Sequence, residues 1–386
     1  MNSQNSSGKC LILHRAPAAS FLHDPMFSAA DHEHMARALR LAERGLNSTT
    51  PNPRVGCVLV KDGLVVGDGW HERAGEPHAE VHAIQAAGDQ VRGATAYVTL
   101  EPCSHYGRTP PCTQALISAG VHRVVAAMQD PNPQVGGEGL ARLRAAGIIT
   151  ECGLLETEAH ALNIGFASRM TRGRPWLRMK LAASLDGKTA LNNGVSQWIT
   201  GPAARQDGHR WRARACAILT GIGTVRDDDP QLNVRAVDVE RQPLKVLVDS
   251  RLDVPINAKI LRDAHVLIVA AVENREKMDA LRAAGAEVIV LPGLGNKVDL
   301  AALMLELGRR GINELHSEAG FKLNGSLLEA DLVDELLLYL APCLIGDSAR
   351  GMFNLPALES LDGKRRLSIH DVRLLGADLR LLARFS

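Results

Sequence analysis

The first half of the chain alternates helical apolar spacing with short apolar runs. Apolar positions from Asp31 to about Gly45 fall on one side of a helix, for which Asp31 is the expected N-cap. The runs 55–60 and 64–67 flank Lys61-Asp62-Gly63, which is typical of a β-hairpin. Further along, the pattern predicts helices over 78–87, 113–119 and 140–146 and strands over 96–100 and 123–128. This alternation indicates a layered α/β domain with a largely parallel sheet.

A second α/β unit is predicted after the break Thr171-Arg172-Gly173-Arg174-Pro175. A helix is expected over 202–213, and strands over 177–182, 217–219, 245–248, 266–269, 288–290 and 336–339. Such short apolar runs are typical of strands buried on both faces. We therefore expect domains over 27–172 and 173–386. Residues 1–26 have no apolar period and are predicted to be a disordered extension.

Composition narrows the classes of function. The 386 residues are 46% hydrophobic and 23% charged, which fits a globular protein of two or three domains. Lys and Arg (44) nearly balance Asp and Glu (43), and only 3% of the residues are aromatic, so binding to nucleic acid or an anionic membrane is not expected. The seven cysteines are odd in number and irregularly spaced, which argues against a disulfide framework and favours the cytoplasm.

Candidate metal ligands occur where predicted elements begin and end. His78 and Glu80 open a predicted helix, Cys103 follows a predicted strand, and Cys112 comes nine residues later. One imidazole and two thiolates form the ligand set of a catalytic zinc site, which keeps a fourth position for water. Positions 78 and 80 point about 200° apart on a helix, so the zinc is expected beyond the helix N-terminus. Glu80 is then the carboxylate that moves protons, without being a ligand.

Each of these residues alone is ordinary. A cysteine is often just buried, and a His or Glu at a helix start is often a solvated or capping group. Their combination in this order is what indicates a zinc site. The cysteine spacing, C-x8-C, is longer than the C-x-x-C of the zinc deaminases that act on bases in nucleic acids.

The longer cysteine loop carries a family resemblance. The segment Cys103 to Cys112, together with Thr50-Pro51-Asn52-Pro53 and Asp130-Pro131-Asn132-Pro133, resembles the pyrimidine deaminase of riboflavin biosynthesis. The resemblance implies a cytidine-deaminase-like three-layer domain. It also implies a substrate pocket that includes Asn52, His71, Arg108 and Asn132.

The second half resembles the reductase of the same bifunctional family, whose fold is similar to dihydrofolate reductase. The resemblance lies in the segments 179–190, 196–201, 220–225, 228–230 and Ser317-Glu318-Ala319-Gly320, the last with Ala319 in place of a family glycine. By resemblance, the residues that contact NADPH are Ala182, Trp198, Thr224, Asp228, Ser250, Gly320, Phe321, Lys322, Leu323, Asn324, Gly325 and Ser326. Those that contact substrate are Lys180, Ser196, Arg212, Leu232, Arg235 and Glu318. Hydride transfer needs a cationic or acidic group at the sugar oxygen, and both Lys180 and Asp228 are candidates.

The resemblance covers about residues 30–386 and implies two consecutive reactions. The first is the zinc-dependent hydrolytic deamination of 2,5-diamino-6-(5-phosphoribosylamino)pyrimidin-4(3H)-one. The second is the NADPH-dependent reduction of the ribose of 5-amino-6-(5-phosphoribosylamino)uracil to ribityl. A homo-oligomer through the reductase domain is expected. The alternatives are a deaminase of bases in nucleic acid, which the balanced charge disfavours, and an inactive, zinc-stabilised interaction module.

Overall fold

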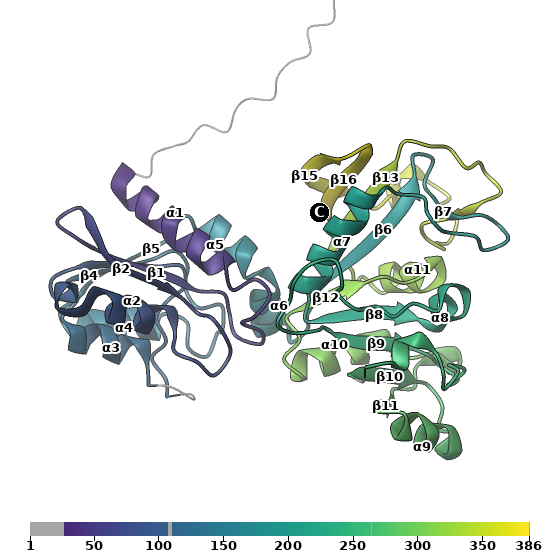
Figure 1. Cartoon of the computed structure of the whole chain (residues 1–386), viewed down its shortest axis with the longest axis horizontal. Helices are drawn as coiled ribbons and strands as arrows, with labels where there is room; N and C mark the ends of the chain where they lie inside the picture. The colour runs from purple at the N-terminus through teal and green to yellow at the C-terminus, as the bar shows by residue number, and fades with distance from the viewer. Residues whose placement is uncertain (1–26, 107–109, 264, 386) are drawn as a thin grey trace, which may run out of the picture.

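The computed structural model describes residues 27–106, 110–263 and 265–385. Two large sheets lie side by side along the longest axis of the molecule (Figure 1). The extension predicted over residues 1–26 and the candidate residue Arg108 lie outside the described residues. Sheet pairing changes between residues 152 and 176, so each half of the chain builds its own sheet. The domain boundaries expected from the sequence fall in this interval and stay a prediction.

The N-terminal half contains a mixed five-stranded sheet in the order β2-β1-β3-β4-β5. Its strands are β1 (Gly56–Lys61), β2 (Leu64–Trp70), β3 (Thr95–Val98), β4 (Arg123–Ala126) and β5 (Ile149–Cys152). Its helices are α1 (Ala29–Glu43), α2 (Ala79–Ala87), the 3-10 helix η1 (Gly88–Val91), α3 (Cys112–Ala119), α4 (Glu138–Ala145), α5 (Glu156–Leu162) and α6 (Ile164–Arg172). The sheet is only partly parallel because the hairpin β1-β2 opens it, and β1 also pairs antiparallel with β3.

One detail of this half differs from the sequence prediction. The N-cap of α1 is Ser28, whereas Asp31 is its third helical residue and accepts hydrogen bonds from the Ser28 backbone and hydroxyl. Asp31 thus completes a capping box, in which two side chains satisfy each other's backbone donors. The helices also lie unusually close to the sheet: a Cβ at Gly56 would lie 2.0 Å from the Ala38 carbonyl oxygen, and one at Gly69 would lie 2.5 Å from the His82 Cβ.

The C-terminal half contains a nine-stranded sheet in the order β11-β10-β9-β8-β12-β6-β13-β16-β15. Its strands are β6 (Trp176–Ser184), β8 (Ala217–Gly221), β9 (Leu244–Val248), β10 (Val266–Ala270), β11 (Ala286–Val290), β12 (Glu314–Ser317), β13 (Glu335–Ala341), β15 (Leu367–Leu375) and β16 (Asp378–Phe385). A small second sheet pairs β7 (Lys188–Ala190) with β14 (Arg350–Gly351). The predicted strands are present, and β8 and β10 are buried along their whole length.

Helices complete the C-terminal half. They are α7 (Pro202–Arg214), α8 (Ile222–Asp228), α9 (Arg275–Ala283), α10 (Leu300–Arg309) and α11 (Phe321–Glu329), with 3-10 helices η2 (Lys259–Leu261), η3 (Leu294–Asn296) and η4 (Leu361–Gly363). Helix α6 lies at the junction of the two halves, and α9 lies at the far end of the second half (Figure 1). None of the helices in the described part of the chain is both long and apolar enough to cross a bilayer.

A buried charge cluster joins the two halves. Glu314, fully buried at the start of β12, accepts hydrogen bonds from Arg54 of the N-terminal half (2.6 Å) and from Arg178 (3.0 Å) and Arg214 (2.8 Å) of its own half. Burial alone raises the pKa of a carboxyl, but the three guanidinium groups outweigh it and hold the pKa of Glu314 well below its usual range. An unpaired buried charge costs free energy, so the loss of Glu314 or of one arginine would destabilise the contact between the two halves.

Candidate active sites

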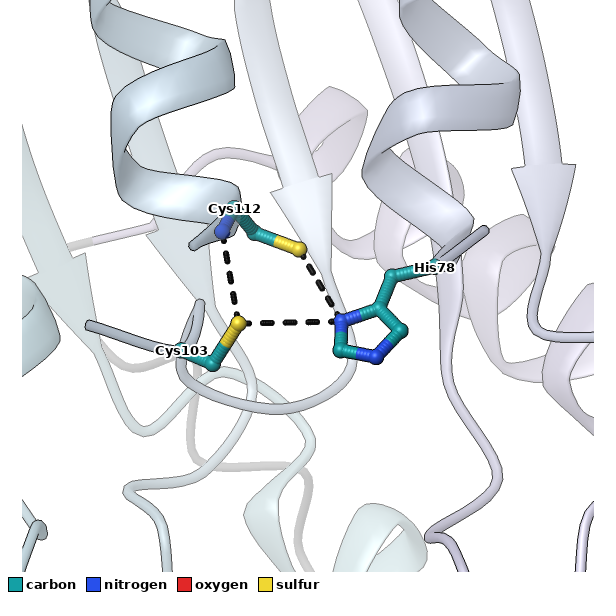
Figure 2. Close-up of side chains that lie close together, drawn as sticks. All are labelled: His78, Cys103 and Cys112. Atoms are coloured by element: carbon teal, nitrogen blue, oxygen red, sulfur yellow. Dashed lines mark hydrogen bonds between the residues drawn. The ribbon is translucent and has the colours of Figure 1, made fainter. Parts of the chain in front are cut away.

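The predicted metal ligands come together at two helix N-termini. His78 is the N-cap of α2, Cys112 is the first residue of α3, and Cys103 lies in the loop after β3 (Figure 2). The His78 Nδ1 lies 3.1 Å from the Cys112 Sγ and 3.6 Å from the Cys103 Sγ, and the ligand atoms of all three residues are within 4.8 Å of one another. As the spacing predicted, the cluster lies beyond the N-terminus of α2.

This cluster fits a zinc ion. Tetrahedral zinc with the usual bond lengths places its nitrogen and sulfur ligands about 3.6–3.8 Å apart, close to the spacing seen here. The hydrogen bond from Cys112 and the contact with His78 together lower the pKa of Cys103 to about 4. The backbone N–H of Cys112 also donates to the Cys103 Sγ at 3.3 Å. The surroundings therefore favour a thiolate at Cys103, the form that binds zinc, whereas the hydrogen bond with Cys103 and burial raise the pKa of Cys112.

Glu80 lies beside this cluster as a buried carboxyl. It is the second residue of α2 and is only 3% exposed. Burial raises its pKa, and the negative charge of the Cys103 thiolate raises it further. A carboxyl in such surroundings holds a proton more readily than one in water, as a proton shuttle must.

A cavity of about 440 Å³ opens onto the cluster, and its volume suits a small organic molecule. It is lined by Pro51, Asn52, Pro53, Val55, His71, Ala74, Gly75, Glu76, His78, Glu80, Leu100, Glu101, Cys103, His105, Asp130, Asn132, Val135, Phe166 and Met170. The structure thus brings three of the four predicted pocket residues, Asn52, His71 and Asn132, to one cavity with the predicted ligands His78 and Cys103.

A hydrogen-bonded chain orients Asn52 in this cavity. The His71 Nδ1 lies 3.1 Å from the Pro77 carbonyl oxygen, which can only accept a hydrogen bond, so Nδ1 carries the proton. The His71 Nε2 therefore accepts from the Asn52 amide nitrogen at 3.0 Å. Burial lowers the pKa of His71, which favours this neutral ring. The Asn52 side-chain oxygen is then oriented away from His71, as an acceptor for a ligand.

Glu101 also lines this cavity, although no role was predicted for it from the sequence. Its buried carboxylate accepts four backbone N–H groups. Oε2 accepts from Asp130 (3.0 Å) and Gly137 (2.8 Å), and Oε1 accepts from Gly139 (2.8 Å) and Leu140 (3.1 Å). Glu101 thereby fixes the loop that carries Asn132. The only sequence signal was its place between a strand and Cys103.

The second candidate site is centred on Glu318, just after β12. Arg212 donates two hydrogen bonds to its carboxylate, and the Lys180 Nζ lies 3.7 Å from Oε2. Burial alone would raise the pKa of Glu318, but Arg212 and Lys180 hold it well below its usual range. His209, which the sequence did not single out, is buried on α7 near these charges.

The other predicted reductase residues have varied surroundings. Asp228 accepts a hydrogen bond from Ser196 (3.0 Å), and a Cβ at Gly320 would lie 3.5 Å from the Thr224 Oγ1, so α8 and the start of α11 are neighbours. The Trp198 side chain is 66% exposed. By contrast, the Leu232 side chain is buried in the core, and Gly325 packs so tightly that a Cβ would lie 2.0 Å from the Asn354 carbonyl oxygen.

Of the remaining predicted residues, Lys322 lies over the Phe321 ring, Asn324 donates to the Ala319 carbonyl, and Arg235 donates to the Asn233 side chain. Ser250 accepts from the Val298 backbone, and Ser326 donates to the Lys322 carbonyl. Ala182 lies on β6 and Leu323 on α11. Their contacts with NADPH or substrate stay predictions.

Comparison with known proteins shows that each half of the chain matches a known protein family. Residues 28–128 match the cytidine and deoxycytidylate deaminase zinc-binding region, and residues 175–381 match the RibD C-terminal domain. Fold and site therefore define a bifunctional enzyme, a zinc-dependent deaminase followed by a reductase, with Zn²⁺ and NADPH as cofactors.

Full-length relatives give the family. The chain is 49% identical to the riboflavin biosynthesis protein RibD of Escherichia coli over 365 residues, which covers 91% of this chain and 98% of that protein. The structure of Acinetobacter baumannii RibD superposes with a TM-score of 0.86 at 45% identity, covering 92% of this chain and 99% of the other. The deaminase/reductase structure from Thermotoga maritima gives 0.82 at 31% identity with the same coverage. The chain belongs to the RibD family of riboflavin biosynthesis enzymes.

Proposed function

We propose that His78, Cys103 and Cys112 hold the zinc ion and that Glu80 moves the protons during deamination of 2,5-diamino-6-(5-phosphoribosylamino)pyrimidin-4(3H)-one. The observation that carries this proposal is the convergence of the three ligand atoms at one point, beside a cavity that His78, Cys103 and the buried Glu80 line. When bound, zinc supplies a Lewis acid that makes water nucleophilic near neutral pH.

The chain's own groups then manage protons and orientation. Glu80 takes up the two protons of the attacking water in turn on a carboxylate oxygen. It passes one to the ring nitrogen beside the amino-bearing carbon and the other to the exocyclic amino nitrogen, which leaves as ammonia. Water supplies the oxygen of the new ring carbonyl, so atoms and charge balance. Asn52, held by His71, presents an acceptor to the pyrimidine, and Asn132 lies on the loop that Glu101 fixes.

In the reductase half, we assign Lys180 as the cation that faces the sugar oxygen. NADPH, when bound, supplies the hydride to C1′ of the ribose. Arg212 is already engaged by Glu318 and by the Asn233 carbonyl oxygen, whereas Lys180 has a longer contact of 3.7 Å with Glu318. Lys180 is therefore the freer cation to stabilise charge on the sugar oxygen as the ring opens, and Arg212 positions Glu318.

Paired variants test this division of roles. Glu80→Gln should retain zinc and NADPH oxidation on deaminated substrate but lose ammonia release by at least about a hundredfold, because only its proton shuttle is lost. Lys180→Met should retain ammonia release but lose NADPH oxidation on deaminated substrate. Ammonia and NADPH are scored separately in the full chain. Loss of both activities in either variant would refute the two-site assignment.

We further propose that a second copy of the chain covers β15, in a reducing, cytoplasmic setting. Strand β15 is at the edge of the nine-stranded sheet, and Ile369, Val372 and Leu374 on it are 64%, 52% and 75% exposed. Exposed apolar edge strands favour association. The six cysteines among the described residues are all unpaired, which suits a reducing compartment. Sedimentation should show a dimer or larger for the wild type and a smaller species for Leu374→Asp; identical masses would exclude this interface.

A further inference from the structure

The deaminase cavity lies against the reductase half of the same chain. Residues 49–54 belong to the segment between α1 and β1. Pro51, Asn52 and Pro53 of this segment line the cavity, and Arg54 follows them. Several contacts from beyond residue 160 reach this segment. Arg54 pairs with Glu314, and Thr50 lies 3.2 Å from the Cys216 Sγ.

Asn313 makes the most specific of these contacts. It directly precedes β12, is 5% exposed, and donates from its side-chain nitrogen to the Pro51 carbonyl oxygen at 3.0 Å. Its side-chain oxygen accepts from Arg169 Nε at 2.6 Å, and Arg169 donates to the same Pro51 carbonyl at 3.2 Å. Both donors thus hold one peptide group from behind the cavity.

That peptide group joins Pro51 to Asn52. From Asn52 the hydrogen bonds continue to His71 and then to the Pro77 carbonyl, one residue before His78. The two histidine rings also meet edge to face, with centroids 5.2 Å apart. A displacement of the Pro51 peptide therefore moves the Asn52 side chain first. The predicted metal ligands lie further along this series of contacts and are disturbed less.

We propose that Asn313, a residue of the reductase half, is a positioning residue for the deaminase. It acts by fixing the Pro51–Asn52 peptide, so that Asn52 meets the pyrimidine in a set orientation. This inference rests on the proposed deaminase function of the cavity. It assigns Asn313 no contact with substrate and no part in the reductase reaction.

The test compares Asn313→Ala and Asn313→Asp in the full chain. Asp has the shape of Asn and still accepts from Arg169, but it places an oxygen against the Pro51 carbonyl. Each variant should raise the deaminase KM about tenfold, the effect of losing one buried hydrogen bond. The zinc content, the deaminase kcat to within about twofold and the reductase kcat/KM should be retained, because only the orientation of Asn52 is disturbed.

Asn274→Ala is the matched control. It removes an asparagine of the reductase half whose side chain accepts from the Lys277 backbone at the start of α9, far from the junction. Its deaminase KM should equal that of the wild type. The proposal is wrong if both Asn313 variants keep the wild-type deaminase KM, or if both activities fall together as a loosened fold would require. Failure of the deaminase function itself shows differently, as ammonia release that survives in Glu80→Gln.

Discussion

Glu101 shows how one side chain can hold a whole loop of the deaminase site. A carboxylate that accepts four N–H groups satisfies donors that would otherwise be buried without partners. In Glu101→Gln, the side-chain NH2 group must replace one carboxylate oxygen. The two backbone N–H groups that this oxygen accepted from then face a donor instead of an acceptor. We predict that deaminase kcat/KM falls about 10- to 100-fold, since unsatisfied buried donors cost about 1–3 kcal/mol, while zinc content is unchanged. Steady-state ammonia release, measured beside elemental analysis, checks this; unaltered kcat/KM would show that the loop needs no such clamp.

His209 gives the reductase half a dependence on pH. Burial, together with the charges of Arg212 and Arg235, lowers the pKa of His209 to about 4. Because the folded pKa lies below the ordinary 6.5, the stability that this neutral ring contributes is complete above pH 6.5 and is lost as the pH falls toward 4.

We predict that the urea midpoint for loss of reductase activity falls less between pH 7 and pH 4.5 in His209→Gln than in the wild type. Gln cannot take up the proton that destabilises the folded histidine. Lys180 and Glu318 also act on this ring, so the comparison is made at constant salt. An equal fall of the urea midpoint in the two proteins would contradict the prediction.

At the scale of elements, the sequence predicted what depends on local spacing. The buried strands β8 to β10 and the helix start at His78 follow from apolar runs and motif spacing that neighbouring residues contain. Strand β12 was missed because its four residues include Glu314 and His316, which look exposed. Both are fully buried, and Glu314 is neutralised by arginines distant in sequence, which no local pattern records.

Strand β15 was missed for the opposite reason. It is at a sheet edge, none of its nine positions is fully buried, and a register shift between Ile369 and Asp371 interrupts its alternation of apolar and polar residues. The site shows the same limit. The ligand cluster was predictable from its motif, but the partners of Glu101 lie 29–39 residues away, and the Pro51 carbonyl beside Asn52 is held by Asn313 of the other half.

The close packing of α2 on β2 leads to a prediction at this scale. In Gly69→Ala, the new Cβ would meet the His82 Cβ at 2.5 Å and the Ala79 carbonyl oxygen at 2.9 Å, so the first turns of α2 must shift. Because α2 carries Glu80, deaminase activity should fall at least about tenfold, with a stability cost of about 1–3 kcal/mol and little change in reductase activity. Gly208→Ala, whose Cβ meets nothing within 4 Å on α7, should leave both activities intact. Equal deaminase activities of the two variants would contradict the prediction that α2 must shift in Gly69→Ala.

The whole molecule has separate apolar cores in its two halves, which a buried charge cluster joins. The charge cluster around Glu314 and the Asn313 contacts make the junction part of the deaminase, although the two sheets are separate. A chain with independent halves would not need buried ion pairs between them, because each buried charge costs free energy unless it is paired. The order of the halves along the chain also matches the order of the two reactions.

The central claim is that one divalent ion is held by His78, Cys103 and Cys112. The most direct measurement is elemental analysis of the purified full chain and of Cys112→Ala, which removes one thiol at the start of α3. The account predicts about one zinc per chain in the active wild type and, in the variant, zinc well below one per chain together with lost ammonia release, since three protein ligands are the minimum of a catalytic site. Fully active wild type without zinc, or a variant with its full complement of zinc, would contradict it.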